Sequence, residues 1–332
     1  MTGYSKGAIR ALGWMLTLAA LVGAAPAAMA LDANHLILSE VVGQTSGDSS
    51  TGSSYIRVVN PTDSPVEMDQ VYITNGTYYE IALYYRLAYK DPEAQNPGGG
   101  TGGKFHARFP AGYVMAPHDT VAIAIKGNTE FATRYGRQPD FELYEEGYSP
   151  DSVPDLMEAF PGSINAGPLS GGTNSPALEA TAGTVILFTW DGESNLVQDL
   201  DYLIWGTSAS VRVSKTGVTV NSETYQNDTA LNSQHKAPGN GLAFFHALRR
   251  ISADEGDEGS LGNGINGHDE TSEDLGATWE DVFFRISGLY MPPAPAEFHP
   301  SAPIFSDLSL DPMEPYVDHP AKLTATLPSF SA

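Results

Sequence analysis

The chain has 332 residues, of which 40 are acidic and 17 are basic, and its formal net charge is −23. Such an excess of negative charge repels polyanions, which argues against nucleic acid and anionic membranes as main partners and favours cations. There is no cysteine, so disulfides and thiol catalysis are excluded and the fold must rest on a sizeable core. Acidity is also a simple way to keep an exported protein soluble.

The first 30 residues have the pattern of a removable signal peptide. Lys6 and Arg10 give a basic start, residues 11–25 are apolar and alanine-rich, and Ala28-Met29-Ala30 is a small-x-small cleavage site. We therefore expect an exported protein, secreted or held at the cell surface. A retained membrane anchor is the alternative. The run is poor in large apolar residues, however, and no later run is long enough to span a bilayer.

Short apolar runs separated by turn residues predict an all-β fold, because Val, Ile and Tyr suit a half-buried pleated surface. Residues 77–89 are dense in tyrosine and do not distinguish strand from helix. Residues 242–251 fit either a strand or a short helix. The expected strands are Leu36–Val42, Tyr55–Val59, Val71–Thr74, 121–125, Thr184–Trp190 and Leu196–Gly206, with a further strand pair around Lys215–Gly217.

Helical patterns are few. One short helix is predicted to begin at Thr129, a candidate N-cap, and to end at Gly136. A second short helix is predicted at Pro154–Phe160, because proline is common in the first turn of a helix. The Pro-, Gly- and Asn-rich stretch 137–183 is interpreted as a long insertion packed on the strands.

Several segments together resemble the lamin-tail domain family, in particular its exported bacterial branch. They are NPTDSPVEMDQVYIT (60–74), APHDTVAIA (116–124), VILFTWDG (185–192) and DLDYLIWG (199–206). The resemblance implies an immunoglobulin-like β-sandwich with long insertions, over residues 31–288. It also implies a non-catalytic module of lamins and bacterial surface proteins, found beside hydrolases and adhesion-type domains. The family has no catalytic residue set to carry over.

The end of the chain resembles part of a second domain. After a Pro-rich linker at 289–303, residues 304–332 look like the first two strands of a bacterial immunoglobulin-like repeat. Apolar residues alternate with polar ones at Leu308 and Leu310 before a turn, and again at Leu323 and Ala325 after it. Such a sandwich needs about 100 residues, so we expect a truncated chain or a reading frame that ends inside a larger surface protein.

Side chains with oxygen atoms that can bind a metal are concentrated in the least hydrophobic stretch, residues 253–281. Ca²⁺ takes carboxylate, amide and carbonyl oxygens from a flexible loop, and the glycines there allow a tight backbone, although the spacing is not an EF-hand. A solvated acidic loop is the alternative. The loop also holds Glu255, Glu258, Glu273 and Asp274. The residues selected as candidate ligands there are Asp254, Asp257, Asn263, Asn266, Asp269 and Glu270.

A second candidate cation site is the pair Asp199 and Asp201, which share one face of an expected strand. Two neighbouring carboxylates repel each other unless a cation or an arginine lies between them. A solvent-facing pair beside a turn is the alternative.

Signatures of several enzyme classes are missing from the sequence. It has no G-x-S-x-G elbow, no H-E-x-x-H and no P-loop, although a triad built from distant residues stays open. We expect an exported non-catalytic module for adhesion or for positioning a protein or cell-envelope partner, with Ca²⁺ as its one candidate cofactor. One alternative is an accessory domain of a secreted nuclease or phosphatase whose catalytic part lies elsewhere. Another is a stand-alone hydrolase with a site in 137–183.

Overall fold

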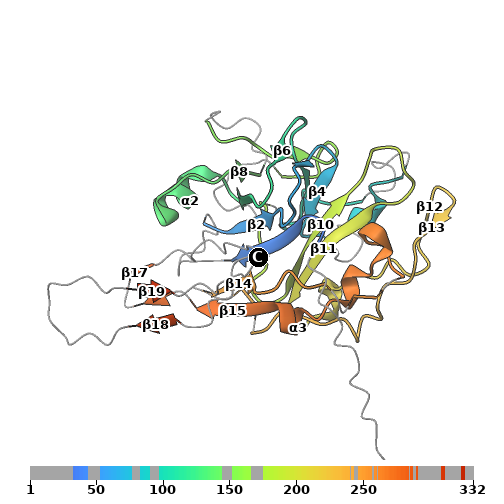
Figure 1. The fold of residues 1–332 in the computed structure, drawn as a ribbon. Helices are drawn as coiled ribbons and strands as arrows, with labels where there is room; N and C mark the ends of the chain where they lie inside the picture. The colour runs from blue at the N-terminus through green and yellow to red at the C-terminus, as the bar shows by residue number, and fades with distance from the viewer. Residues whose placement is uncertain are drawn as a thin grey trace, which may run out of the picture.

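The computed structural model describes residues 33–43, 53–76, 83–89, 97–143, 152–165, 175–239, 241–242, 246–255, 258–259 and 261–283, and the backbone of four short strands beyond them. These residues form two β-sheets that share one core (Figure 1). The all-β sandwich with long insertions and a few short helices is thereby confirmed. The proposed signal peptide lies outside the described residues.

The larger sheet has six strands and contains the N-terminal strand near its centre. All its pairs are antiparallel except the last, β7 with β8, which is parallel. Its order is β15 (Trp279–Phe283), β14 (His246–Arg250), β1 (Ile37–Val42), β2 (Tyr55–Val59), β7 (Thr120–Ala124) and β8 (Phe141–Glu142).

The second sheet has five strands, all antiparallel. Its order is β11 (Gln198–Trp205), β10 (Gly183–Thr189), β4 (Val71–Thr74), β5 (His106–Arg108) and β9 (Met157–Glu158). Shorter pairs are β3 (Val66–Glu67) with β6 (Val114–Met115), β12 (Thr219–Val220) with β13 (Glu223–Thr224), β16 (Arg285–Ile286) with β17 (Leu289–Tyr290), and β18 (Leu308–Leu310) with β19 (Leu323–Ala325).

Helical segments are short and lie in the connections. The α-helices are α2 (Asn128–Tyr135) and α3 (Leu275–Thr278), and the 3-10 turns are η1 (Tyr84–Arg86), η2 (Ala209–Val211), η3 (Ile265–Gly267) and η4 (Glu270–Ser272). No helix in the described part of the chain is long and apolar enough to cross a membrane.

Strand β1 is buried on both faces. Leu38 and Val41 belong to the central core between the sheets, whereas Val42 belongs to an outer cluster that α2 covers. The Phe131 ring of α2 packs edge-on against Tyr55 of β2 with ring centroids 5.4 Å apart. A strand covered on both faces can be apolar at consecutive positions, as Ile37-Leu38 and Val41-Val42 are in β1.

Three local predictions are wrong. Pro154–Phe160 is not helical, because Met157–Glu158 adds strand β9 to the edge of β5. The strand pair expected around Lys215–Gly217 forms later, as β12 and β13, because the buried Lys215 ties its segment into the core. The N-cap of α2 is Gly127 and not Thr129, whereas Gly136 does end the helix in the left-handed conformation.

The insertion at 137–183 contributes a strand to each sheet rather than lying on top of them. Its described parts supply β8 to the first sheet and β9 to the second. Near the end of the chain, the β16–β17 hairpin straddles the predicted domain boundary at 288, so the first two linker residues are strand. The two strands predicted in the tail pair with each other as β18 and β19.

Candidate metal centre

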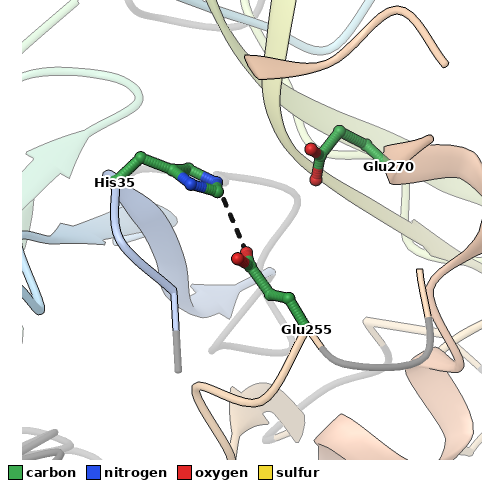
Figure 2. A group of neighbouring side chains, drawn as sticks. All are labelled: His35, Glu255 and Glu270. Atoms are coloured by element: carbon green, nitrogen blue, oxygen red, sulfur yellow. Dashed lines mark ion pairs between the residues drawn. The ribbon is translucent and has the colours of Figure 1, made fainter. Parts of the chain in front are cut away.

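Three side chains from distant parts of the sequence converge beside the end of the sandwich (Figure 2). His35 precedes β1, Glu255 follows β14, and Glu270 opens the 3-10 turn η4. One nitrogen or oxygen atom of each lies within 4.8 Å of the others, and all three residues are buried. Figure 2 shows the Glu270 carboxylate turned toward the space in front of His35 and Glu255.

The carboxylates of this cluster have too few hydrogen-bond donors. Both oxygens of Glu270, both oxygens of Glu258 and one oxygen of Glu255 are buried without a hydrogen-bond partner. Glu270 is only 1 % exposed, and so is the side chain of Glu258. A buried carboxylate without donors is costly unless it is neutralised by a proton or a cation. We call Glu255, Glu258 and Glu270 the carboxylate triad.

The charge state of the triad reflects this shortage. Burial, followed by the charges of Glu255 and Glu273, raises the pKa of Glu258 to about 9. Burial, followed by the charges of Glu258 and Glu255, raises the pKa of Glu270 well above its usual range. At neutral pH the triad therefore holds protons that a divalent cation would displace.

His35 forms an ion pair with the triad through Glu255, and its hydrogen bond goes to a backbone carbonyl. Its Nε2 lies 2.7 Å from the Leu200 carbonyl, which only accepts, and 3.3 Å from Glu255 Oε1. Burial lowers the pKa of His35, but the hydrogen bond and charge of Glu255 outweigh it, and the net pKa is raised. Its Nδ1 lies 3.3 Å from Asn34 Oδ1, so both ring nitrogens face oxygen atoms of the protein and the atoms left to bind a cation are the carboxylate oxygens. An all-oxygen set fits Ca²⁺ better than zinc or iron.

A small cavity reaches two members of the triad, Glu255 and Glu258, from one side. It has a volume of about 80 Å³, and its lining includes Glu255, Glu258, Asp254 and Asp274. A cavity needs about 10–15 Å³ of such space to hold one water molecule, so this one has room for an ion with a few waters. Acidic side chains line this route inward, which suits the entry of a cation.

The tight backbone of the loop brings the triad together. A Cβ placed on Gly262 would lie 2.3 Å from Asp269 Cα, and one on Gly264 would lie 2.5 Å from a Glu270 carboxylate oxygen. Gly262 also donates to the Gly267 carbonyl at 2.9 Å. Residues Gly262–Gly267 spell G-x-G-x-x-G, as do Gly98–Gly103, but neither segment joins a strand to a helix as dinucleotide-binding turns do.

The predicted pair Asp199 and Asp201 is buried and not solvent-facing, and each carboxylate has its own cation. Asp201 Oδ1 accepts from Arg250 Nη2 at 2.7 Å, and Arg250 also binds Glu273 at 2.6 Å. Asp199 pairs with the Lys215 ammonium and accepts from the Tyr84 hydroxyl at 2.7 Å. Burial raises the pKa of both aspartates although their partners lower it. Neither aspartate is left free for a metal.

Of the candidate ligands in the loop, only Glu270 belongs to the triad. Asn263 donates to the Asp228 carboxylate at 2.6 Å, and Asn266 donates to Asn34 at 3.2 Å. Asp269 accepts from both Thr271 and Thr229 and so caps η4. Asp254 is half-buried at the cavity rim, and Asp257 lies outside the described residues. The loop is thus a packed acidic cluster and not a solvated one.

The sequence pattern missed two parts of the site. Glu255 and Glu258 are among the acidic residues of the loop, but nothing in their spacing distinguishes them as metal ligands from the neighbouring acids. His35 carried no signal, because its role depends on the approach of Glu255 across 220 positions. Only the folded chain shows which acids have donors and which do not.

Comparisons with known proteins do not assign a family. A scan against models of protein families finds no match, and neither does a search of curated proteins. Among solved structures, the chain is similar to a DUF4876 family protein from Bacteroides thetaiotaomicron. The TM-score is 0.43 and the sequence identity is 16 %, over 79 % of this chain and 75 % of that one. The resemblance to lamin-tail domains stays a prediction.

Proposed function

We propose that this chain is an exported, non-catalytic surface module whose acidic loop is fastened to its β-sandwich by a calcium ion. The observation that carries the proposal is the carboxylate triad, in which five buried oxygens accept no hydrogen bond. Elsewhere in the described core, Asp199, Asp201 and Glu40 each have a cationic partner. The triad acids have no lysine or arginine partner among the described residues; Glu255 and Glu258 have only histidine contacts, at 3.3 Å to His35 and 3.5 Å to His268.

A bound calcium would act as a cross-link between distant segments. Glu255 follows the central sheet, whereas Glu258 and Glu270 belong to the loop that leads back to the edge strand β15. Holding these segments together stabilises a thiol-free exported protein that has no disulfides. The surface then stays available for a protein or cell-envelope partner.

The contacts of four described histidines do not form a Ser-His-Asp arrangement. His118, His246 and His268 each face a carboxylate through one ring nitrogen. No serine or threonine hydroxyl is hydrogen-bonded to the other nitrogen of these pairs in the described part of the chain. His106 does contact the Thr74 hydroxyl, but its other nitrogen faces the Pro97 carbonyl, so it lacks the carboxylate of a triad.

Calorimetry with and without calcium tests the proposal. We expect the melting temperature of the purified protein to rise on adding Ca²⁺ after treatment with EDTA. Glu270→Gln removes the response, whereas Glu223→Gln, an exposed glutamate on β13, keeps it. A melting temperature that does not change in millimolar Ca²⁺ would overturn the calcium role. Esterase or phosphodiesterase turnover by the purified chain would overturn the non-catalytic role and favour the stand-alone hydrolase.

A further inference from the structure

A lysine, two aspartates and a tyrosine form a closed cluster inside the sandwich. Lys215 lies in the segment after η2 and is fully buried. Its ammonium pairs with an Asp199 carboxylate oxygen on β11 and lies 3.3 Å from Asp228 Oδ1. The Tyr84 hydroxyl accepts from the same ammonium at 3.0 Å and donates to Asp199 Oδ1 at 2.7 Å. An amine and a carboxyl group are thus held in contact away from water.

The cluster contains one carboxylate more than an ion pair needs. Asp199 alone balances the charge of Lys215, yet Asp228 faces the same ammonium. Asp228 Oδ1 also accepts from the Asn263 side chain at 2.6 Å, and its Oδ2 accepts from the backbone amide of Lys215. These two donors stabilise Asp228 as a charged base whether or not the lysine is an ammonium.

Burial favours the uncharged forms of the groups in this cluster. It raises the pKa of Asp199, although Lys215 lowers it. It lowers the pKa of Lys215, but the two aspartates outweigh it and the net pKa is raised. The lysine therefore needs a base before it can act as a nucleophile, and Asp228 is in reach. Burial and the charge of Asp199 raise the pKa of Tyr84 well above its usual range, so its hydroxyl stays a donor.

We infer that the side chains of Lys215 and Asp199 join in an intramolecular amide bond. Asp228 takes a proton from the Lys215 ammonium and passes it to Asp199 Oδ2. The neutral amine then attacks the carboxyl carbon of Asp199, and the Tyr84 hydroxyl stabilises the negative charge that develops on Oδ1. A second proton moves from the nitrogen through Asp228 to Oδ2, which leaves as water. A C–N bond replaces a C–O bond, nothing is oxidised or reduced, and Asp228 is again a carboxylate.

The arginine pairs of the core provide an internal contrast. Asp201 and Glu273 are also buried acids, but both face Arg250, and a guanidinium stays protonated in proteins. Lys215 offers an amine instead, which becomes nucleophilic once it loses a proton. The amide bond would fasten β11 to the segment after η2 in a chain that has no cysteine for a disulfide.

Mass spectrometry of the purified full chain tests this inference, which does not depend on the calcium proposal. Under denaturing conditions we expect a mass lower by one water than the sequence of the purified chain requires. Trypsin cuts after Arg212, which lies between the two residues, so the digest should contain two linked peptides. One holds Asp199, and the other holds Lys215, where trypsin no longer cuts. A chain of full mass, or a loss of water confined to a single peptide, would overturn the inference.

Two variants test the role of the second aspartate. Asp228→Asn keeps the shape of the side chain but removes the base, so the folded variant should have its full mass and lack the linked peptides. Asp63→Asn changes an aspartate whose side chain is 98 % exposed and should form the link as the parent chain does. Linked peptides in folded Asp228→Asn at the yield of the parent chain would overturn the proposed proton transfer. The mass of the parent chain decides on the bond itself even if Asp228→Asn does not fold.

Discussion

The Arg250 guanidinium on β14 binds the Asp201 carboxylate on β11 across 2.7 Å and so joins the two sheets through the core. The same guanidinium donates to Glu273 at 2.6 Å and to the Leu38 carbonyl at 2.9 Å, and it lies over the Trp279 ring at 5.0 Å. One arginine therefore connects both sheets to the acidic loop. Its five donors and flat shape suit this position better than a lysine would.

Replacing this arginine should destabilise the protein strongly. Arg250→Met leaves Asp201 and Glu273 buried without their cation, and breaking a buried pair from one side costs about 3–5 kcal/mol. Urea unfolding at pH 7 measures the loss. The triple variant Arg250→Met, Asp201→Asn, Glu273→Gln should recover a large part of it, because no bare charge remains. A single variant within about 0.5 kcal/mol of the parent chain, the range of an ordinary surface change, would contradict this account.

The calcium-free protein should become less stable as the pH rises from 7 to 9. Glu258 and Glu270 have pKa values raised above those of the unfolded chain, so their neutral forms favour the fold and this stability is lost with rising pH. Thermal melts in EDTA across this range measure the slope. The variant Glu258→Gln, Glu270→Gln should flatten it. Equal slopes in the two proteins would refute the raised pKa values.

His106 should stay neutral far below the usual titration range of histidine. Burial lowers its pKa to about 4, and only the Pro97 carbonyl opposes this. The group therefore contributes stability above pH 6.5 that is lost as the pH falls toward 4. Nitrogen-15 NMR of the imidazole follows its protonation directly. A midpoint near 6.5 would show that the ring is accessible to solvent.

Two glycines in the acidic loop make a matched pair for testing the site. Gly262→Ala should distort the loop and weaken the calcium response, because its Cβ would lie 2.3 Å from backbone atoms of Asp269 and His268. Gly259→Ala places its Cβ 3.6 Å from its nearest neighbours, an ordinary contact, and should be tolerated. Melting temperatures with and without Ca²⁺ compare the two variants. Equal behaviour would mean that the tight loop does not assemble the site.

Helix α2 should matter for stability although it lies outside the central core. The Phe131 ring packs against Tyr55 and against Tyr135 at 4.7 Å, and it is 1 % exposed. Phe131→Ala should cost about 3–5 kcal/mol. Tyr135→Phe removes only the hydrogen bond to the Ser53 carbonyl and should cost about 1 kcal/mol. Urea unfolding that gives similar losses for both would contradict the packing argument.

The long strands were predictable from the sequence because each is an apolar run with a local signal. Strand β1 is buried on both faces, and the turn at Asp191-Gly192 leads from β10 into β11 as expected. Strands β8 and β9 have two residues each and form by pairing with distant edges, so no local pattern marks them. The candidate site was predictable only as an acidic loop. Which acids lack partners depends on where the fold directs the Arg250 and Lys215 side chains, which bind Asp201, Glu273, Asp199 and Asp228 and not the triad.

Equilibrium dialysis with radioactive calcium at pH 7.5 is the most direct test of the carboxylate triad. We predict one bound ion per parent chain, and binding at least tenfold weaker in the folded Glu258→Gln, Glu270→Gln variant. If the parent chain retains no calcium, or if the double variant binds it as tightly as the parent, then the triad is not a calcium site.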